Sequence, residues 1–135
     1  MSEKKRVLII EDNWEHLMAL AIKLKSNGYT IVSATDGMSA ISVTRKEKPD
    51  AILLDLGLPA GDGFVVLERL KNLECSVTTP VIVVSAREPK VNRPRALQAG
   101  AAAYLQKPVQ TEELLKALRI ALCDPSEAHE HTAFE

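Results

Sequence analysis

The chain has 135 residues, with 17 lysines and arginines against 18 aspartates and glutamates, so its formal net charge is −1. With 46% hydrophobic residues and nearly balanced charges, it cannot be largely disordered, and nucleic-acid binding through bulk positive charge is disfavoured. The two cysteines, Cys75 and Cys123, are typical of free thiols in a reducing compartment. The longest apolar runs, such as Leu17–Ile22, are too short to span a membrane. We therefore expect a single-domain cytoplasmic protein that does not insert into membranes.

Short runs rich in valine, isoleucine and leucine alternate along the chain with longer segments of helical periodicity. The runs predict strands at Val7–Ile10, Tyr29–Ala34, Ala51–Leu54, Val81–Val84 and Ala102–Leu105. Continuous apolar strands are typical of a parallel sheet that is covered on both faces. Their strict alternation with helices predicts right-handed βαβ units and a three-layer α/β sandwich.

Apolar residues three or four positions apart predict the buried sides of the helices. These stripes are Trp14, Leu17, Met18, Ala21 and Leu24 in the first helix, Phe64, Leu67, Leu70 and Leu73 in the third, and Leu114, Leu115, Leu118 and Leu122 in the fifth. The sequence also predicts helix ends. Thr111 is expected to be the N-cap of the fifth helix, Gly28 and Gly100 to end helices, and Pro94 to lie in the first turn of the fourth helix.

The last 13 residues differ in composition from the rest, with four acids and no lysine or arginine. Pro125 is expected to stop the last helix. The sequence therefore predicts one domain over residues 5–122 and an acidic, disordered tail at 123–135. His129 and His131 could be a metal-binding pair, but we interpret them as ordinary residues of this tail.

Polar side chains follow four of the five predicted strands. Glu11 and Asp12 come after the first strand, Asp55 after the third, Ser85 at the end of the fourth and Lys107 after the fifth. In an open parallel sheet, ligands bind beyond the carboxyl ends of the strands. We therefore expect three carboxylates, a hydroxyl and an ammonium group to meet at one edge of the sheet.

Each of these residues also has an ordinary structural interpretation. Asp12 or Asn13 could cap the following helix, and a single lysine or serine at a strand end means little. Asp55, however, follows a buried strand, where a carboxylate without a partner is costly. Capping does not explain why such residues stand at four strand ends at once.

Clustered carboxylates raise one another's pKa unless a cation neutralises them. Magnesium suits a site with few oxygen ligands from protein, because it keeps water molecules and is completed by phosphate oxygens. A lysine and a hydroxyl could hold the remaining phosphate oxygens. The pattern indicates transfer of a phosphoryl group to or from a carboxylate, through an acyl phosphate on an aspartate.

The sequence resembles the receiver domain of two-component response regulators over about residues 5–122. The resemblance rests on VLIIEDN at 7–13, ILLDLGLPAGDGF at 52–64, VIVVSAR at 81–87 and GAAAYLQKP at 100–108. The spacings are also similar to those of the family, because Ser85 follows Asp55 by 30 residues and Lys107 follows it by 52. The resemblance implies a flavodoxin-like (βα)5 fold with a parallel five-stranded sheet of order 2-1-3-4-5.

The resemblance also implies a role for individual residues. Asp55 would be the phosphoacceptor, while Ser85 and Lys107 would bind its phosphoryl group. Ser85 and Tyr104 would form the conformational switch. The bond between Lys107 and Pro108 resembles a cis peptide of the family.

Further residues are implied to bind metal or to set the rate. Glu11, Asp12, Asp55 and the backbone carbonyl of Gly57 would hold Mg²⁺ or Mn²⁺. Gly57 and Arg87 stand at positions that tune the lifetime of the phosphorylated form. Departures from the commoner family pattern are mild, since Glu11 replaces an aspartate, Ser85 replaces a threonine and Gly57 has no side chain.

The function implied is a signalling switch that accepts a phosphoryl group from a sensor histidine kinase or a histidine phosphotransfer protein. It would not be an enzyme beyond its own phosphorylation and dephosphorylation. Because 13 residues cannot form a DNA-binding module, we expect no direct DNA binding but a downstream protein target, and a monomer or weak dimer. Residues 86–119 carry seven basic and three acidic side chains. They would form either a solvated basic face or a surface for an acidic partner.

Three alternatives remain open at this stage. An aspartyl-nucleophile phosphohydrolase would need a second aspartate where Gly57 stands. A flavodoxin-like electron carrier would need a phosphate-binding loop after the first strand, where the acidic residues would repel phosphate. A pseudo-receiver that acts only as a scaffold would not need the Asp12, Asp55, Ser85 and Lys107 that this chain has.

Overall fold

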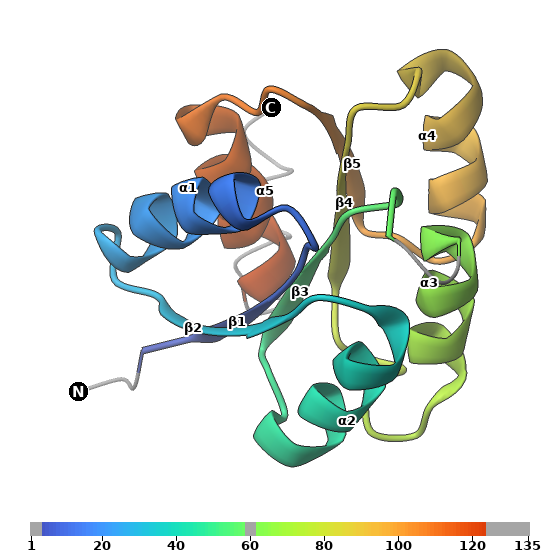
Figure 1. Cartoon of the computed structure of the whole chain (residues 1–135), viewed down its shortest axis with the longest axis horizontal. Helices are drawn as coiled ribbons and strands as arrows, with labels where there is room; N and C mark the ends of the chain where they lie inside the picture. The colour runs from blue at the N-terminus through green and yellow to red at the C-terminus, as the bar shows by residue number, and fades with distance from the viewer. Residues whose placement is uncertain (1–3, 59–61, 124–135) are drawn as a thin grey trace.

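A computed structural model describes residues 4–58 and 62–123. Within these residues, five parallel strands form one sheet in the order β2-β1-β3-β4-β5 (Figure 1). The strands are β1 (Arg6–Ile10), β2 (Thr30–Ala34), β3 (Ala51–Leu54), β4 (Val81–Ser85) and β5 (Ala103–Gln106). The predicted flavodoxin-like order is confirmed, and every predicted strand end lies within one residue of the observed one.

Helices cover both faces of this sheet. In the described part of the chain they are α1 (Trp14–Lys25), α2 (Gly37–Glu47), α3 (Gly63–Asn72), α4 (Pro89–Gln98) and α5 (Thr111–Leu122). Helices α1 and α5 lie on one face, and α2, α3 and α4 lie on the other (Figure 1). The three layers predicted from the alternation are therefore present. Among the described helices, none has the length and apolar character that crossing a membrane requires.

The alternation of side chains along each strand builds two separate cores. In β1, Val7 and Ile9 pack against α1 and α5, whereas Leu8 and Ile10 pack against the opposite three helices. All four are at most 1% exposed. Because β1 is buried on both sides, it is a rigid base for the residues that follow it.

Two of the predicted helix ends are wrong. Thr111 is the first residue of α5, and the N-cap is Gln110, whose side chain makes no capping bond. Pro94 lies inside α4, which begins instead at Pro89 after the cap residue Glu88. Of the two prolines in α4, Pro89 stands at the first helical position, where a missing N–H costs nothing.

The predicted glycine stops are confirmed. Gly28 and Gly100 have φ angles of +92° and +106°, in the left-handed region that favours glycine. The N–H of Gly100 donates to the carbonyl of Leu97 at 3.1 Å, which satisfies one of the last carbonyls of α4.

The predicted buried stripe of α1 is partly wrong. Trp14 is 68% exposed and Met18 is 36% exposed, while Leu17 and Leu24 are buried as expected. The helix packs through an arc that also includes Leu20, so the predicted stripe was rotated toward solvent. Helical spacing alone does not tell which part of a wide apolar arc meets the sheet.

The last described helix ends at Leu122. The expected acidic tail at 123–135, with His129 and His131, lies outside the described residues except for Cys123.

Candidate functional site

Hydrogen bonds that continue the strand pairing bring the expected residues to one edge of the sheet. The N–H of Glu11 donates to Ala34 at 3.0 Å, and the N–H of Asp55 donates to Ile10 at 3.0 Å. On the other side, the N–H of Lys107 donates to the carbonyl of Ser85 at 2.8 Å. Each residue just past a strand is therefore fixed by backbone bonds to its neighbour.

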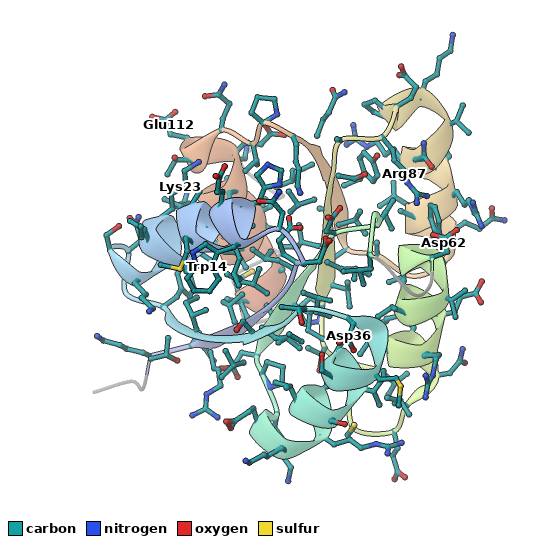
Figure 2. All side chains as sticks on the ribbon, viewed as in Figure 1. Trp14, Lys23, Asp36, Asp62, Arg87 and Glu112 are labelled. Atoms are coloured by element: carbon teal, nitrogen blue, oxygen red, sulfur yellow. The ribbon has the colours of Figure 1, made fainter. Side chains whose placement is uncertain are left out.

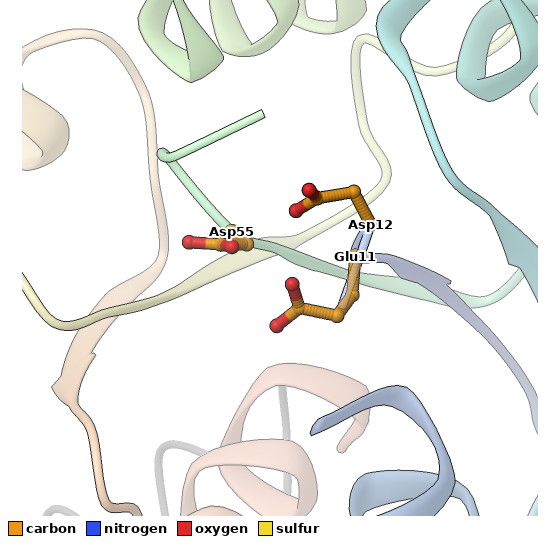
Figure 3. A group of neighbouring side chains, drawn as sticks. All are labelled: Glu11, Asp12 and Asp55. Atoms are coloured by element: carbon orange, nitrogen blue, oxygen red, sulfur yellow. The ribbon is translucent and has the colours of Figure 1, made fainter. Parts of the chain in front are cut away.

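The three acidic residues form a cluster beyond β1 and β3 (Figure 3). One carboxylate oxygen from each of Glu11, Asp12 and Asp55 lies within 4.8 Å of the others. Glu11 is buried, Asp55 is half-buried and Asp12 is exposed. The cluster is thus open on the side of Asp12, where a cation and its water molecules could enter.

Asp12 does not cap α1. The N-cap is Asn13, whose side-chain oxygen accepts the N–H of His16 at 3.0 Å. The N–H of Asn13 itself donates to Glu11 at 3.2 Å. Because Asn13 does the capping, the carboxylate of Asp12 is available to a ligand.

Lys107 joins the acidic cluster from β5. Its ammonium group donates a short hydrogen bond to Glu11 and lies 3.5 Å from an oxygen of Asp55. The Nζ atom is also 3.1 Å from Nδ1 of His16. The side chain is only 15% exposed, so its charge acts in an environment that solvent screens weakly. The bond between Lys107 and Pro108 is cis, as the resemblance implied.

The electrostatics of the cluster favour a bound cation. Burial raises the pKa of the Glu11 carboxyl above its ordinary value of 4.5, the hydrogen bond from Lys107 lowers it, and neighbouring Asp55 raises it again. One lysine therefore does not fully compensate two neighbouring carboxylates. An all-oxygen donor set with excess negative charge fits Mg²⁺ or Mn²⁺.

Ser85 and Tyr104 both bind the backbone of Arg87. The hydroxyl oxygen of Ser85 accepts the N–H of Arg87 at 3.0 Å, and the hydroxyl of Tyr104 donates to the carbonyl of Arg87 at 2.8 Å. Both side chains are buried. The two residues expected to form a switch are therefore connected through one residue of the β4–α4 loop.

The side chain of Arg87 is partly exposed and points to the start of α3 (Figure 2). Its guanidinium donates to the carbonyl of Leu56 at 3.2 Å and lies 3.5 Å from Asp62. The same group lies 5.9 Å from the centre of the Phe64 ring, while Arg95 of α4 stacks on that ring at 3.8 Å. The expected rate-tuning arginine is thus held beside the residue that follows Asp55.

Gly57 leaves the acceptor open. Its N–H donates to the Asp55 carboxylate at 3.1 Å. A Cβ atom placed on Gly57 would lie 3.7 Å and 3.9 Å from the two carboxylate oxygens of Asp55. A side chain at position 57 would therefore stand next to the acceptor without colliding with it.

The expectations from sequence missed two residues of this region. His16 contacts both Lys107 and Glu11, and Asp62 contacts Arg87. His16 lies in the first turn of α1, and no spacing in the sequence indicates its contact with Lys107, which is 91 residues further along the chain. Asp62 precedes an apolar helical run, which predicts a cap but gives no sign of the arginine.

The fold and the site together define a doubly wound α/β domain with a carboxylate–lysine centre at the carboxyl edge of its sheet. Residues 7–119 match the family described as the response regulator receiver domain, and the chain belongs to this family. It is therefore a signalling domain of two-component systems rather than a member of an enzyme family in the usual sense.

Individual relatives agree with this assignment. The chain is 40% identical over 116 residues to the transcriptional regulatory protein KdpE of Mycobacterium tuberculosis, covering 86% of this chain and 50% of KdpE. It is 33% identical over 118 residues to protein PilH of Pseudomonas aeruginosa, covering 87% of this chain and 97% of PilH. The chain thus spans about half the length of KdpE and nearly all of PilH.

A solved structure with the same fold comes from Pseudomonas aeruginosa PAO1. It is the receiver domain of the sensor histidine kinase PA1611, with a magnesium ion coordinated in its active-site cleft. The two chains are 30% identical with a TM-score of 0.81, and the match covers 88% of this chain and 98% of the other.

Proposed function

We propose that this domain is a phosphoacceptor switch, in which Asp55 takes a phosphoryl group from a sensor histidine kinase or a histidine phosphotransfer protein. The observation that carries the proposal is the position of Asp55 among two further carboxylates and the ammonium group of Lys107. A nucleophilic carboxylate that is half-buried beside one fixed cation suits transfer of a highly charged group.

Glu11, Asp12 and Asp55 would hold Mg²⁺ or Mn²⁺, together with the backbone carbonyl of Gly57. When bound, the cation supplies positive charge to the phosphoryl oxygens and allows three carboxylates to remain ionised side by side. The Mg²⁺-bound relative from Pseudomonas supports this choice of ion.

In the transfer step, an oxygen of the Asp55 carboxylate forms a bond to phosphorus while the bond from phosphorus to the donor histidine nitrogen breaks. The electron pair of that bond stays on the imidazole. Lys107, at 3.5 Å from Asp55 before the reaction, would bind one oxygen of the transferred group, and Ser85 would donate its hydroxyl to another. To reach the phosphoryl group, the Ser85 side chain would rotate and change its hydrogen bond with the Arg87 backbone. Because the hydroxyl of Tyr104 donates to the carbonyl of Arg87, the position of Tyr104 would change as well.

The signal would leave through the face formed by α4, β5 and α5. A groove of about 320 Å³ lies there, with Arg93 and Lys116 among its lining residues. The excess of basic side chains in this segment supports a protein target with an acidic surface. The scaffold alternative, which needs no phosphorylation, has no observation in its favour.

The test is incubation with a small phosphodonor such as acetyl phosphate, followed by measurement of the intact mass. We expect the gain of one phosphoryl group when Mg²⁺ is present and no gain when a chelator removes it. Equal labelling with and without divalent cation would contradict the metal-dependent acceptor.

A further inference from the structure

The guanidinium of Arg87 is held by groups that follow the acceptor in the chain. Leu56 comes directly after Asp55, and its carbonyl accepts a hydrogen bond from Arg87 at 3.2 Å. Asp62, at the start of α3, lies 3.5 Å from the other end of the guanidinium. Figure 2 places the Arg87 and Asp62 side chains next to each other, where the β4–α4 loop approaches α3. Through this hydrogen bond and ion pair, the β4–α4 loop is connected to the segment that follows the acceptor.

This ion pair is weak enough to be exchanged. The two side chains are 39% and 40% exposed, so solvent screens their attraction. A phosphoryl group on Asp55 would add a dianion to the residue that precedes Leu56, whose carbonyl already accepts a hydrogen bond from Arg87. Arginine binds phosphate through several parallel hydrogen bonds, so this dianion would compete with Asp62 for the guanidinium.

We propose that Asp62 is a positioning residue that draws Arg87 away from the phosphorylated acceptor and thereby shortens the life of the phosphorylated state. The proposal rests on the proposed function and adds to it a residue that sets how long the signal lasts. Asp62 would not touch the reacting atoms itself. It would act only by changing the fraction of molecules in which the guanidinium of Arg87 binds the phosphoryl group.

The reaction affected is hydrolysis of the acyl phosphate. A water oxygen forms a bond to phosphorus as the bond from phosphorus to the Asp55 oxygen breaks, and the electron pair stays on the Asp55 carboxylate. Both protons of the water leave on the inorganic phosphate and then exchange with solvent. The water must approach in line with the breaking bond. A guanidinium bound to the phosphoryl oxygens obstructs that approach, whereas one bound to Asp62 does not.

Asp62 also caps α3, and this structural role has to be separated from the proposed one. Its carboxylate accepts the N–H of Phe64 at 3.0 Å. Asn caps helices as well as Asp, so Asp62→Asn removes the charge and keeps the cap. Asp36 offers a matched control, since it caps α2 through the N–H of Ser39 and makes no ion pair in the described part of the chain.

The experiment measures the half-life of the phosphorylated protein after removal of the phosphodonor, by intact mass. Asp62→Asn should lengthen the half-life by about twofold to fivefold, the factor by which an exposed ion pair biases an equilibrium. Arg87→Ala should shorten it, and adding Asp62→Asn to Arg87→Ala should change nothing further. Asp36→Asn should leave the half-life of the wild-type protein unchanged. Urea unfolding midpoints should be the same for Asp62→Asn and wild type.

An unchanged or shorter half-life in Asp62→Asn would overturn the proposal. So would equal lengthening in the presence and absence of Arg87, because Asp62 would then act by another route. These results differ from failure of the proposed function, in which the wild-type protein takes up no phosphoryl group at all. That last result would reject both.

Discussion

The ammonium group of Lys107 lies 3.5 Å from a carboxylate oxygen of Asp55 while it also donates to Glu11. One half-buried cation is thus shared between two carboxylates that stand at the ends of neighbouring strands. The negative charge that remains lies toward Asp12, the exposed member of the cluster. This distribution suggests where a divalent cation would bind and which residue would govern its affinity.

Asp12→Asn should therefore weaken Mg²⁺ binding. The substitution removes a charged ligand, and we expect the half-saturating Mg²⁺ concentration to rise by at least about tenfold. Losing a residue that only hydrogen-bonds to a metal ligand already weakens metal binding by about that factor. The fluorescence of Trp14, two residues away, can follow the titration. Glu15→Gln is the matched control, because Glu15 is an exposed acid in the first turn of α1 outside the cluster. Equal affinities for wild type and Asp12→Asn would contradict the assignment.

The raised pKa of Glu11 predicts a pH dependence of stability in the absence of metal. A carboxyl that binds its proton more tightly when folded contributes fully below its unfolded pKa of 4.5, and that contribution is lost as the pH rises through its higher folded pKa. The free energy of unfolding of wild type should thus fall, relative to Glu11→Gln, as the pH rises from 4.5 through the higher folded pKa of Glu11.

Urea denaturation of both proteins over this pH range, with a chelator present, measures the difference. Saturating Mg²⁺ should reduce the slope, because a bound cation favours the ionised carboxylate. A difference between the two proteins that stays constant with pH would show that Glu11 does not titrate in this way.

Most of the fold could be predicted because strands that are buried on both faces consist almost entirely of apolar residues. Each strand reads as an uninterrupted apolar run, and the β3 run at Ala51–Leu54 coincides with the observed strand. Helix faces were less predictable, since Trp14 and Met18 share the period of the buried residues but lie on the solvent side of the arc. Helix starts at Thr111 and Pro94 were wrong because several residues near each start were chemically suitable caps or first residues.

Gly63 provides a test of how the site is built. A Cβ atom on Gly63 would lie 2.4 Å from the Cα of Leu56, a backbone atom that cannot move aside cheaply. Gly63→Ala should lower the free energy of unfolding by about 1–3 kcal/mol, as overpacking does. Gly57→Ala is the control, because its nearest atoms would be 3.7 Å away, and we expect a change within about 0.5 kcal/mol. Both are measured by urea denaturation, and equal stability of the two variants would contradict the close approach of α3 to Leu56.

Ser85→Ala should separate phosphorylation from its readout. The variant keeps Asp55 and Lys107 and should still be labelled, but it loses the hydroxyl that accepts the N–H of Arg87 and that we propose binds the phosphoryl group. Its Arg87 N–H is left without that partner, at a cost of about 1 kcal/mol. Amide spectra with and without a beryllofluoride mimic of the phosphoryl group should change around Tyr104 in wild type and in Ser85→Thr, and much less in Ser85→Ala. Equal changes in all three would show that Ser85 does not transmit the signal.

The site could be predicted as far as the strand ends specify it. Parallel strands bring their carboxyl ends together, so Glu11, Asp12, Asp55, Ser85 and Lys107 had to meet at one edge. Contacts between side chains from loops and helices, such as His16 with Lys107 and Asp62 with Arg87, depend on rotamers and packing that no spacing in the sequence records. These lateral contacts are where the structure added most.

The most direct test of the central claim is the intact mass of wild type and Asp55→Asn after incubation with acetyl phosphate and Mg²⁺. The substitution keeps the shape of the side chain but removes its nucleophilic carboxylate, so the fold should persist. We expect one acid-labile phosphoryl group on wild type and none on the variant. Equal labelling of the two proteins would contradict Asp55 as the acceptor, and with it the proposed phosphoryl-transfer site.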